Sequence, residues 1–329
     1  MNPRSKIAAA ALALLAVSLP ASQALRGPHS TAVQGQFTQA QIEQMVAPIA
    51  LHPDALLTQI LSASTYPIEV VQAQRWVDQN PGLVGSGLEE ALQTQAWDPS
   101  VKALCGFPTV LKQMSDDLDW TRDLGDAFLN QKIELMDAVQ RLRKKALDAG
   151  NLKTTPQETV VQSEGTIVIE PASPAVIYVP AYSPLVVYGP GWYYPYWYYP
   201  YGYYPPPHGG GYVSFGIGFW WGSACWSHCD WHHHTVFVDA VAFQTFTTRT
   251  CSKPVPPAHL DGSSGRPTGR FFEWTHDPNH RKGATYAVPR PAPPDLRERP
   301  GRERPAPPPR RPKPGGRRGP GGHDASKRD

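Results

Sequence analysis

Residues 51–71 read LHPDALLTQILSASTYPIEVV, and this stretch decides the fold class. Its apolar residues recur at the spacing of one helix face, which predicts an amphipathic helix with one buried side. Pro53 and Pro67 stand where prolines are tolerated, in the first turn of a helix, so a second helix should follow the first. The buried face of the first helix comprises Leu56, Leu57, Ile60 and Leu61.

Helix signals extend on both sides of this stretch, from residue 37 to residue 152. Residues 38–41 and 86–89 both have the pattern of a capping box, in which two side chains bond backbone groups at a helix start. Asp98 and Pro99 should open a short helix. A final, longest helix should end at Gly150, with one apolar stripe. The stripe comprises Phe128, Leu135, Val139, Leu142 and Ala146.

The pattern changes in residues 153–189, where β-branched residues replace helical spacing. Residues 159–161 and 166–169 flank Glu164-Gly165 and predict a hairpin. Residues 176–179 and 185–188 predict two further short strands, which prolines confine to sheet edges or strand starts. These strands are too short for an independent domain, so we expect a small β segment packed on the helices.

The remaining sequence predicts little regular structure. Residues 190–222 are rich in Tyr, Trp, Pro and Gly, which is typical of low complexity. Residues 223–286 contain Cys and His but no clear pattern. Residues 287–329 form a Pro/Arg/Gly tail that should be disordered. The predicted fold is therefore mainly α: an N-terminal helical bundle (37–152), a small appended β segment, then low-complexity and disordered C-terminal sequence.

The N-terminus has the features of a secretory signal peptide over residues 1–24, followed by a linker at 25–36. Arg4 and Lys6 precede a thirteen-residue uncharged run, and small residues near Ala24 offer a cleavage site. A membrane anchor is the alternative, but the run is short of the roughly 20 residues that span a bilayer. We therefore expect export to the periplasm or cell envelope.

Charge is distributed unevenly along the chain. The tail, residues 287–329, carries twelve Lys/Arg and five Asp/Glu, whereas the whole chain has a net charge of +3. The preceding residues are therefore acidic overall. A basic tail is attracted to anionic surfaces such as cell wall or anionic membrane. Nucleic acid is not an expected partner, because export would separate the protein from nucleic acid and no nucleic-acid-binding fold accompanies the tail.

Several motifs resemble a family of exported bacterial proteins catalogued as domain of unknown function 3300. The resemblance rests on residues 51–57, 64–71 and 97–104, and it continues through 169–172 and 178–180. Residues 274–281, WTHDPNHR, resemble a short C-terminal signature of such proteins. The resemblance implies export and the order of segments. It implies no reaction, substrate or catalytic residue.

The sequence CWSHCDWHHH at residues 225–234 is the most pointed local signal for chemistry. Thiolates and imidazoles are preferred ligands of zinc and copper, so these residues are candidates for a metal site. The alternative is a disulfide between Cys225 and Cys229, or pairing with Cys105 or Cys251, beside a solvated His run. The candidate ligands are Cys225, Cys229, His232, His233 and His234.

An aromatic run after residue 190 is the second candidate binding feature. Exposed Tyr and Trp rings stack on sugars and sit at membrane interfaces, because each has an apolar body and a polar edge. The alternative is that the rings cover the helices and the small sheet. The candidate residues are Trp192, Tyr193, Tyr196, Trp197 and Tyr198.

No catalytic signature stands out. An acidic run lies near the start of the long helix, where acids are favoured by the helix dipole without any catalytic role. We therefore expect a non-enzymatic envelope protein that contacts cell wall, a membrane surface or another envelope protein, and we expect no resident cofactor. A metal-binding protein and an envelope hydrolase are the alternatives. The acids of the run are Asp116, Asp117, Asp119, Asp123 and Asp126.

Overall fold

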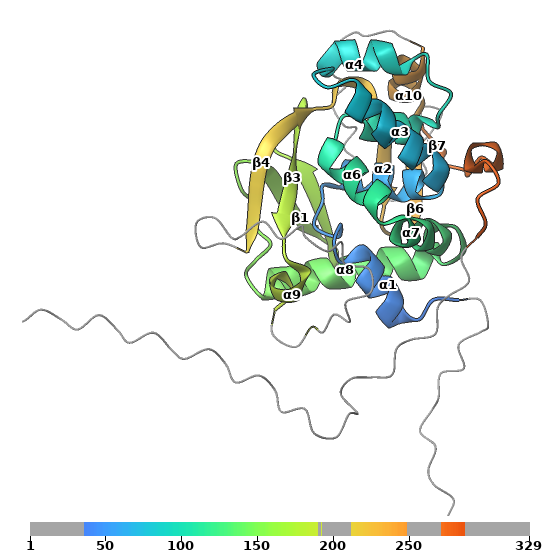
Figure 1. Cartoon of the computed structure of the whole chain (residues 1–329). Helices are drawn as coiled ribbons and strands as arrows, with labels where there is room; N and C mark the ends of the chain where they lie inside the picture. Colours follow the sequence, from blue (N-terminus) through green and yellow to red (C-terminus); the bar gives the residue numbers. More distant parts are fainter. Residues whose placement is uncertain (1–35, 190–191, 193–211, 249–270, 287–329) are drawn as a thin grey trace, which may run out of the picture. The chain divides into compact units, whose positions relative to one another are not determined.

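The computed structural model describes residues 36–189, 192, 212–248 and 271–286 (Figure 1). The chain divides into one unit of residues 1–289 and a second of residues 290–329, and the second lies outside the described residues. The predicted signal peptide, the linker, most of the aromatic run and the basic tail also fall outside them. About half of the described residues are helical, which agrees with a mainly α chain.

Helices dominate the N-terminal half (Figure 1). α2 lies at the centre, in contact with α5 and α7, while α1 packs on α8 and α3 packs on α6. The predicted apolar face of α2 is fully buried, so the opening stretch forms the core as expected. The helices are α1 (Gln39–Val46), α2 (Asp54–Ser64), α3 (Pro67–Gln79), α4 (Gly85–Leu92), α5 (Pro99–Leu104), α6 (Pro108–Asp116), α7 (Leu118–Asn130), α8 (Lys132–Asp148), α9 (Pro184–Val187) and α10 (Ala240–Thr247).

Local signals explain most of the helix starts. The capping box at Thr38 and Gln41 is formed, and Pro67 occupies the first turn of α3 as predicted. The second predicted capping box is wrong: α4 begins at Gly85 without a side-chain cap, so Ser86 already lies inside the helix. The predicted longest helix is confirmed as α8, which ends before Gly150, but Phe128 lies on α7 because the chain breaks at Gln131. Gln131 instead binds Phe37 through both its amide atoms, at 2.7 and 2.9 Å.

A close helix crossing depends on Gly125 in α7. A Cβ atom built there would lie 2.3 Å from the carbonyl oxygen of Ser64, at the end of α2. The obstacle is backbone, so neither helix can yield by rotating a side chain.

We expect Gly125→Ala to lower the free energy of unfolding by about 1–3 kcal/mol or more, because it overpacks this crossing. Gly87→Ala is the matched control, since a Cβ there meets nothing within 4 Å in α4. That change should stabilise by roughly 0.5–1 kcal/mol through helix propensity. Urea unfolding of both variants measures the difference, and equal effects would contradict the close approach.

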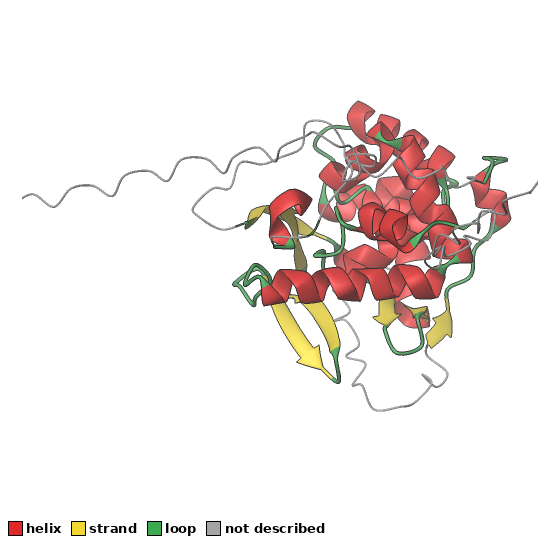
Figure 2. Ribbon diagram, turned by 90° about the horizontal axis from the view of Figure 1, so that it is seen from below, coloured by secondary structure: helices red, strands yellow, loops and turns green. Residues whose placement is uncertain are grey.

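The strands form small antiparallel sheets at the margin of the helices (Figure 2). β1 and β2 make the predicted hairpin, and Glu164 and Gly165 at its turn both have positive φ, as a tight two-residue hairpin turn requires. β3 pairs with β4, and β6 lies between β5 and β7. The strands are β1 (Glu158–Ser163), β2 (Thr166–Pro171), β3 (Val176–Tyr182), β4 (Val213–Trp220), β5 (Ser227–Asp230), β6 (Thr235–Asp239) and β7 (Phe271–Glu273).

The β structure is more than the small appended segment that the sequence predicted. Residues 213–220, interpreted as low complexity, form β4. Gly218 leaves room for the side chains of Val176 and Tyr178, since a Cβ there would lie 2.4 Å from Val176. The strand predicted at residues 185–188 is instead the short helix α9, which starts at Pro184. Within the described ranges, no helix has the length and apolar character needed to cross a membrane.

Candidate functional site

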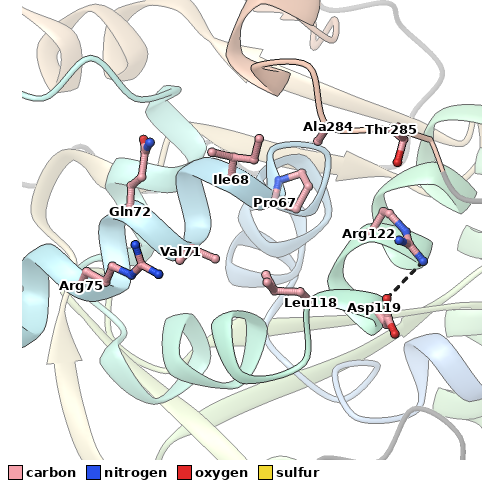
Figure 3. Close-up of a pocket in the computed structure, with 10 residues that line it drawn as sticks. All are labelled: Pro67, Ile68, Val71, Gln72, Arg75, Leu118, Asp119, Arg122, Ala284 and Thr285. Atoms are coloured by element: carbon pink, nitrogen blue, oxygen red, sulfur yellow. Dashed lines mark ion pairs between the residues drawn. The ribbon is translucent and has the colours of Figure 1, made fainter.

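An open groove of about 380 Å³ lies between α3 and α7 (Figure 3). Residues 67–75 of α3 form one side, and residues 118–122 of α7 form the other. Ala284 and Thr285, from the end of the described chain, complete the lining. We call this feature the α3–α7 groove. It is lined by Pro67, Ile68, Val71, Gln72, Arg75, Leu118, Asp119, Arg122, Ala284 and Thr285.

Helical spacing produces the groove. Ile68, Val71 and Arg75 lie three and four residues apart, so α3 presents them on one face. Leu118 faces them from α7, and 43% of its surface is exposed. The floor is therefore apolar and accessible to a ligand.

Two arginines border the apolar floor, and they differ in their surroundings. Arg122 forms ion pairs with Asp119 at 3.2 Å and Asp123 at 3.4 Å. Arg75 is exposed and has no ion pair or side-chain hydrogen bond with any part of the chain that the structure describes. Arg75 is thus available to bind an anion at the rim of the groove.

A buried polar cluster joins α3 to the segment of residues 276–282. Glu69 of α3 is fully buried and accepts a hydrogen bond from the backbone N–H of Asp98 at 2.6 Å. Its other partners are the Nδ1 atom of His280 at 3.0 Å and the Nζ atom of Lys282 at 3.2 Å. A buried carboxylate needs such partners, so Glu69 holds the segment that contains His280 and Lys282 against α3.

Tyr66 makes a second contact with the same segment. Its hydroxyl accepts a hydrogen bond from the backbone N–H of Asp277 at 3.0 Å, and its ring stacks on His276 with 5.1 Å between centroids. Burial is the main cause that raises the pKa of Tyr66 above its usual value. Burial, with Arg281 nearby, lowers the pKa of His276. Both groups are therefore neutral at pH 7.

Arg281 makes the third contact. Its guanidinium lies 2.7 Å from the carboxylate of Asp126 in α7, and both side chains are buried. The same guanidinium donates to the carbonyl oxygens of Thr65, Ala284 and Thr285. Arg281 therefore fixes the two residues that complete the groove.

These contacts join two separate sequence motifs. Residues 64–71 and residues 274–281 both carried the family resemblance, and more than 200 positions separate Tyr66 from Asp277. The motifs fold together beside the groove. His276 and His280 do not share a regular helix, because Pro278 starts the 3₁₀ turn Pro278–Arg281.

A hydroxyl–imidazole pair in this cluster resembles the start of a nucleophilic site. Thr65 Oγ1 lies 3.2 Å from Nδ1 of His276. That hydroxyl donates its single proton to the carbonyl of Ser62 at 2.7 Å, and Thr65 is fully buried. A nucleophile must give its proton to the base, so this pair is a packing contact.

The proposed metal ligands do not converge. The thiols of Cys225 and Cys229 are not disulfide-bonded, and burial raises the pKa of both well above the usual thiol value. His232, His233 and His234 lie at the turn between β5 and β6, beside Glu164, Asp230 and Asp137 respectively. The described ranges hold no group of three His, Cys, Asp or Glu residues arranged to bind a metal.

Most of the candidate aromatic residues lie outside the described residues, namely Tyr193, Tyr196, Trp197 and Tyr198. Trp192 is described, and its ring meets that of Tyr188 edge to face at 4.9 Å. It is partly buried against the core, which agrees with rings that cover the fold at this position.

The acidic run serves several structural purposes. Asp116 pairs with Lys112, and Asp117 caps α7 by accepting from the N–H of Trp120. Asp119 pairs with Arg122, as described above. Asp123 and Asp126 are buried, each beside an arginine. The carboxylates are dispersed among caps and ion pairs.

Sequence reasoning missed the groove residues. Arg75, Arg122 and Leu118 carry no motif, and only the helical spacing of α3 could have indicated a shared face. The approach of α7 and of residues 284–285 is a tertiary event with no local signal.

The fold and site define a helical protein, elaborated by small antiparallel sheets, with a ligand-sized groove beside a buried polar cluster. The chain belongs to the family described as "Protein of unknown function (DUF3300)", whose model matches residues 38–259. It is similar to "Uncharacterized protein YacH" of Escherichia coli (strain K12), with 34% identity. That match covers 82% of this chain and 52% of the relative, so the chain spans about half the relative's length. No solved structure matches it.

Proposed function

We propose that the protein is an exported, non-enzymatic binding module of the cell envelope, with the α3–α7 groove as its ligand site. The features of residues 1–24 support export. The observation that carries the binding role is the groove itself, in which an accessible apolar floor meets Arg75, a cation with no ion pair among the described residues.

The ligand that suits this groove is a short anionic chain with small apolar side groups. The volume of the groove, about 380 Å³, falls in the range of sites that enclose small ligands. A stable protein–protein interface needs roughly 800 Å² from each partner, which is a larger and flatter surface. The peptides of the bacterial cell wall carry free carboxylates and alanine methyl groups, so they match both the cation and the floor. The cell wall is therefore the proposed partner.

Arg75→Gln should weaken binding to isolated cell-wall sacculi by about tenfold, since a charge-assisted hydrogen bond contributes roughly 1.5 kcal/mol. Lys145→Gln is the matched control, because Lys145 is an exposed cation elsewhere, on α8. Co-sedimentation across a salt series measures both variants, and salt should weaken wild-type binding.

Peptides released by digesting the sacculi should compete with intact sacculi for the wild-type protein and lower the amount that co-sediments. The same peptides should not displace the residual Arg75→Gln protein that still co-sediments. Anionic vesicles form the second arm. Equal loss in Arg75→Gln and Lys145→Gln, or binding to vesicles alone, would overturn the groove as a cell-wall site.

A further inference from the structure

A second hollow lies apart from the α3–α7 groove, where the chain leaves α8 and enters β1. Its volume is about 180 Å³, and residues 150–158 and the start of β4 line it. This is below the range of about 300–1,000 Å³ typical of sites for drug-sized ligands. A smaller molecule would fill it.

A buried carboxyl group lines this hollow. Glu158 is 2% exposed, and its Oε2 atom has no hydrogen-bond partner among the described residues. Its backbone is well held, because its N–H donates to Thr155 Oγ1 at 3.2 Å and its carbonyl accepts from the N–H of Thr155. Buried polar atoms are nearly always bonded, so this carboxyl is available to a polar group that enters the hollow.

Electrostatics indicate the charge of a group that would bind this carboxyl. Burial raises the pKa of Glu158 to about 8, and the charge of Arg143 acts in the opposite direction. Burial therefore keeps a proton on this carboxyl at pH 7. An ammonium group within the hollow would stabilise the ionised form and displace that proton.

The rim of the hollow carries the opposite charge. Lys153 lines it, is exposed, and has no ion pair within the described part of the chain. The rings of Tyr212 and Phe215 also line it, and aromatic faces attract ammonium groups. One small hollow thus presents an acid in its wall and a base at its mouth.

We infer that this hollow binds a small zwitterion of the amino-acid class, with its ammonium group on Glu158 and its carboxylate on Lys153. The inference is independent of the proposed cell-wall role, because the two sites share no residue. It assigns a ligand to a carboxyl group whose Oε2 atom has no partner among the described residues.

The test is calorimetric titration of the purified protein at pH 7 with glycine, L-alanine and L-glutamate. Methylammonium and acetate serve as probes that carry only one of the two charges. At least one amino acid should bind tenfold or more tightly than either probe. Titration in two buffers of different ionisation enthalpy should show proton release, and binding should tighten as the pH rises from 6 to 8.

Glu158→Gln should lose tenfold or more in affinity and abolish the proton release. Lys153→Met should weaken binding several-fold and keep the proton release. Glu164→Gln is the matched control, because Glu164 is an exposed glutamate in the neighbouring hairpin turn, and it should bind as the wild type does. If Glu158→Gln does not fold, as judged by circular dichroism, Lys153→Met and the wild-type proton release decide the outcome.

Absence of binding by all three amino acids, or equal affinity of Glu158→Gln and wild type, would overturn the inference. So would binding without proton release.

Discussion

Arg143→Ala should lower the free energy of unfolding by about 3–5 kcal/mol, the cost of breaking a buried ion pair from one side. Arg143 is fully buried in α8, and its Nη1 atom lies 2.6 Å from the carboxylate of Asp54. Its removal would leave that carboxylate mostly buried and without its cation. Small domains are stable by only about 5–15 kcal/mol, so the variant would lose a large share of its stability.

The guanidinium of Arg143 also connects segments that are distant in sequence. It donates to the carbonyl oxygens of Ala50 and His52, before α2, and of Ile167 in β2. It also lies 4.8 Å from the ring centre of Trp231, whose own Nε1 atom donates to Asp54 at 2.7 Å. Loss of the side chain therefore leaves buried acceptors unsatisfied on both the helical and the β parts, which adds to the cost.

Arg141→Ala is the matched control for this experiment. Arg141 lies two residues away on α8 and pairs with Glu43 at 2.8 Å, but 37% of its side chain is exposed. Such surface pairs contribute about 0–1 kcal/mol. Urea unfolding at pH 7 should separate the two variants by at least 2 kcal/mol. Equal losses would show that Arg143 does not act as a buried connection.

The course of α2 and of the hairpin was predictable because their information is local. The apolar spacing of residues 56–61 specifies a buried helix face, and Glu164-Gly165 supplies the positive φ angles of a tight turn. Such signals act within a few residues, so a single sequence reveals them.

The errors have a common physical cause, which is tertiary contact. The stripe from Phe128 to Ala146 was continuous, yet Gln131 leaves the helix to bind the backbone of Phe37, 94 residues away. The Gly-alternating residues 213–220 have weak strand propensity, and they become β4 because β3 offers a pairing edge and Gly218 admits the side chains of Val176 and Tyr178.

The candidate site was missed for the same reason. Arg75 and Glu158 have unremarkable neighbours in sequence, and each gains its importance from what does or does not lie opposite it in the fold. The Cys and His residues at 225–234 form a conspicuous sequence pattern, but the fold gives them different surroundings: Cys225 is buried and Cys229 is half-buried, whereas His232 and His233 are exposed. Composition reveals which chemistry is possible, and only packing decides which groups meet.

Arg281→Ala should release the C-terminal motif from the helices without unfolding them. Arg281 and Asp126 form a buried pair at 2.7 Å, and breaking such a pair costs about 3–5 kcal/mol when the rest of the structure stays in place. Local detachment of residues 274–286 should cost less free energy than keeping the segment in place, because it lets water reach Asp126. Proteins open locally where the local free energy is lower than the global one.

Hydrogen exchange distinguishes the two outcomes. In Arg281→Ala, the amides of Asp277 and His280 should lose protection, while the amides of α2 and α8 keep it. Asp126→Asn should give a weaker effect, since an amide oxygen still accepts from the guanidinium. Lys112→Ala, which breaks an exposed pair with Asp116, is the control and should change neither region. Uniform loss of protection would mean that the motif is part of the global core.

The detached segment should also affect the α3–α7 groove, because Arg281 holds Ala284 and Thr285 in its lining. Arg281→Ala should therefore weaken sacculus binding although Arg75 is intact. Protected helices together with weakened binding would assign the motif the role of building one side of the ligand site. Normal binding by a variant with a released segment would show instead that α3 and α7 suffice, and that the motif contributes stability alone.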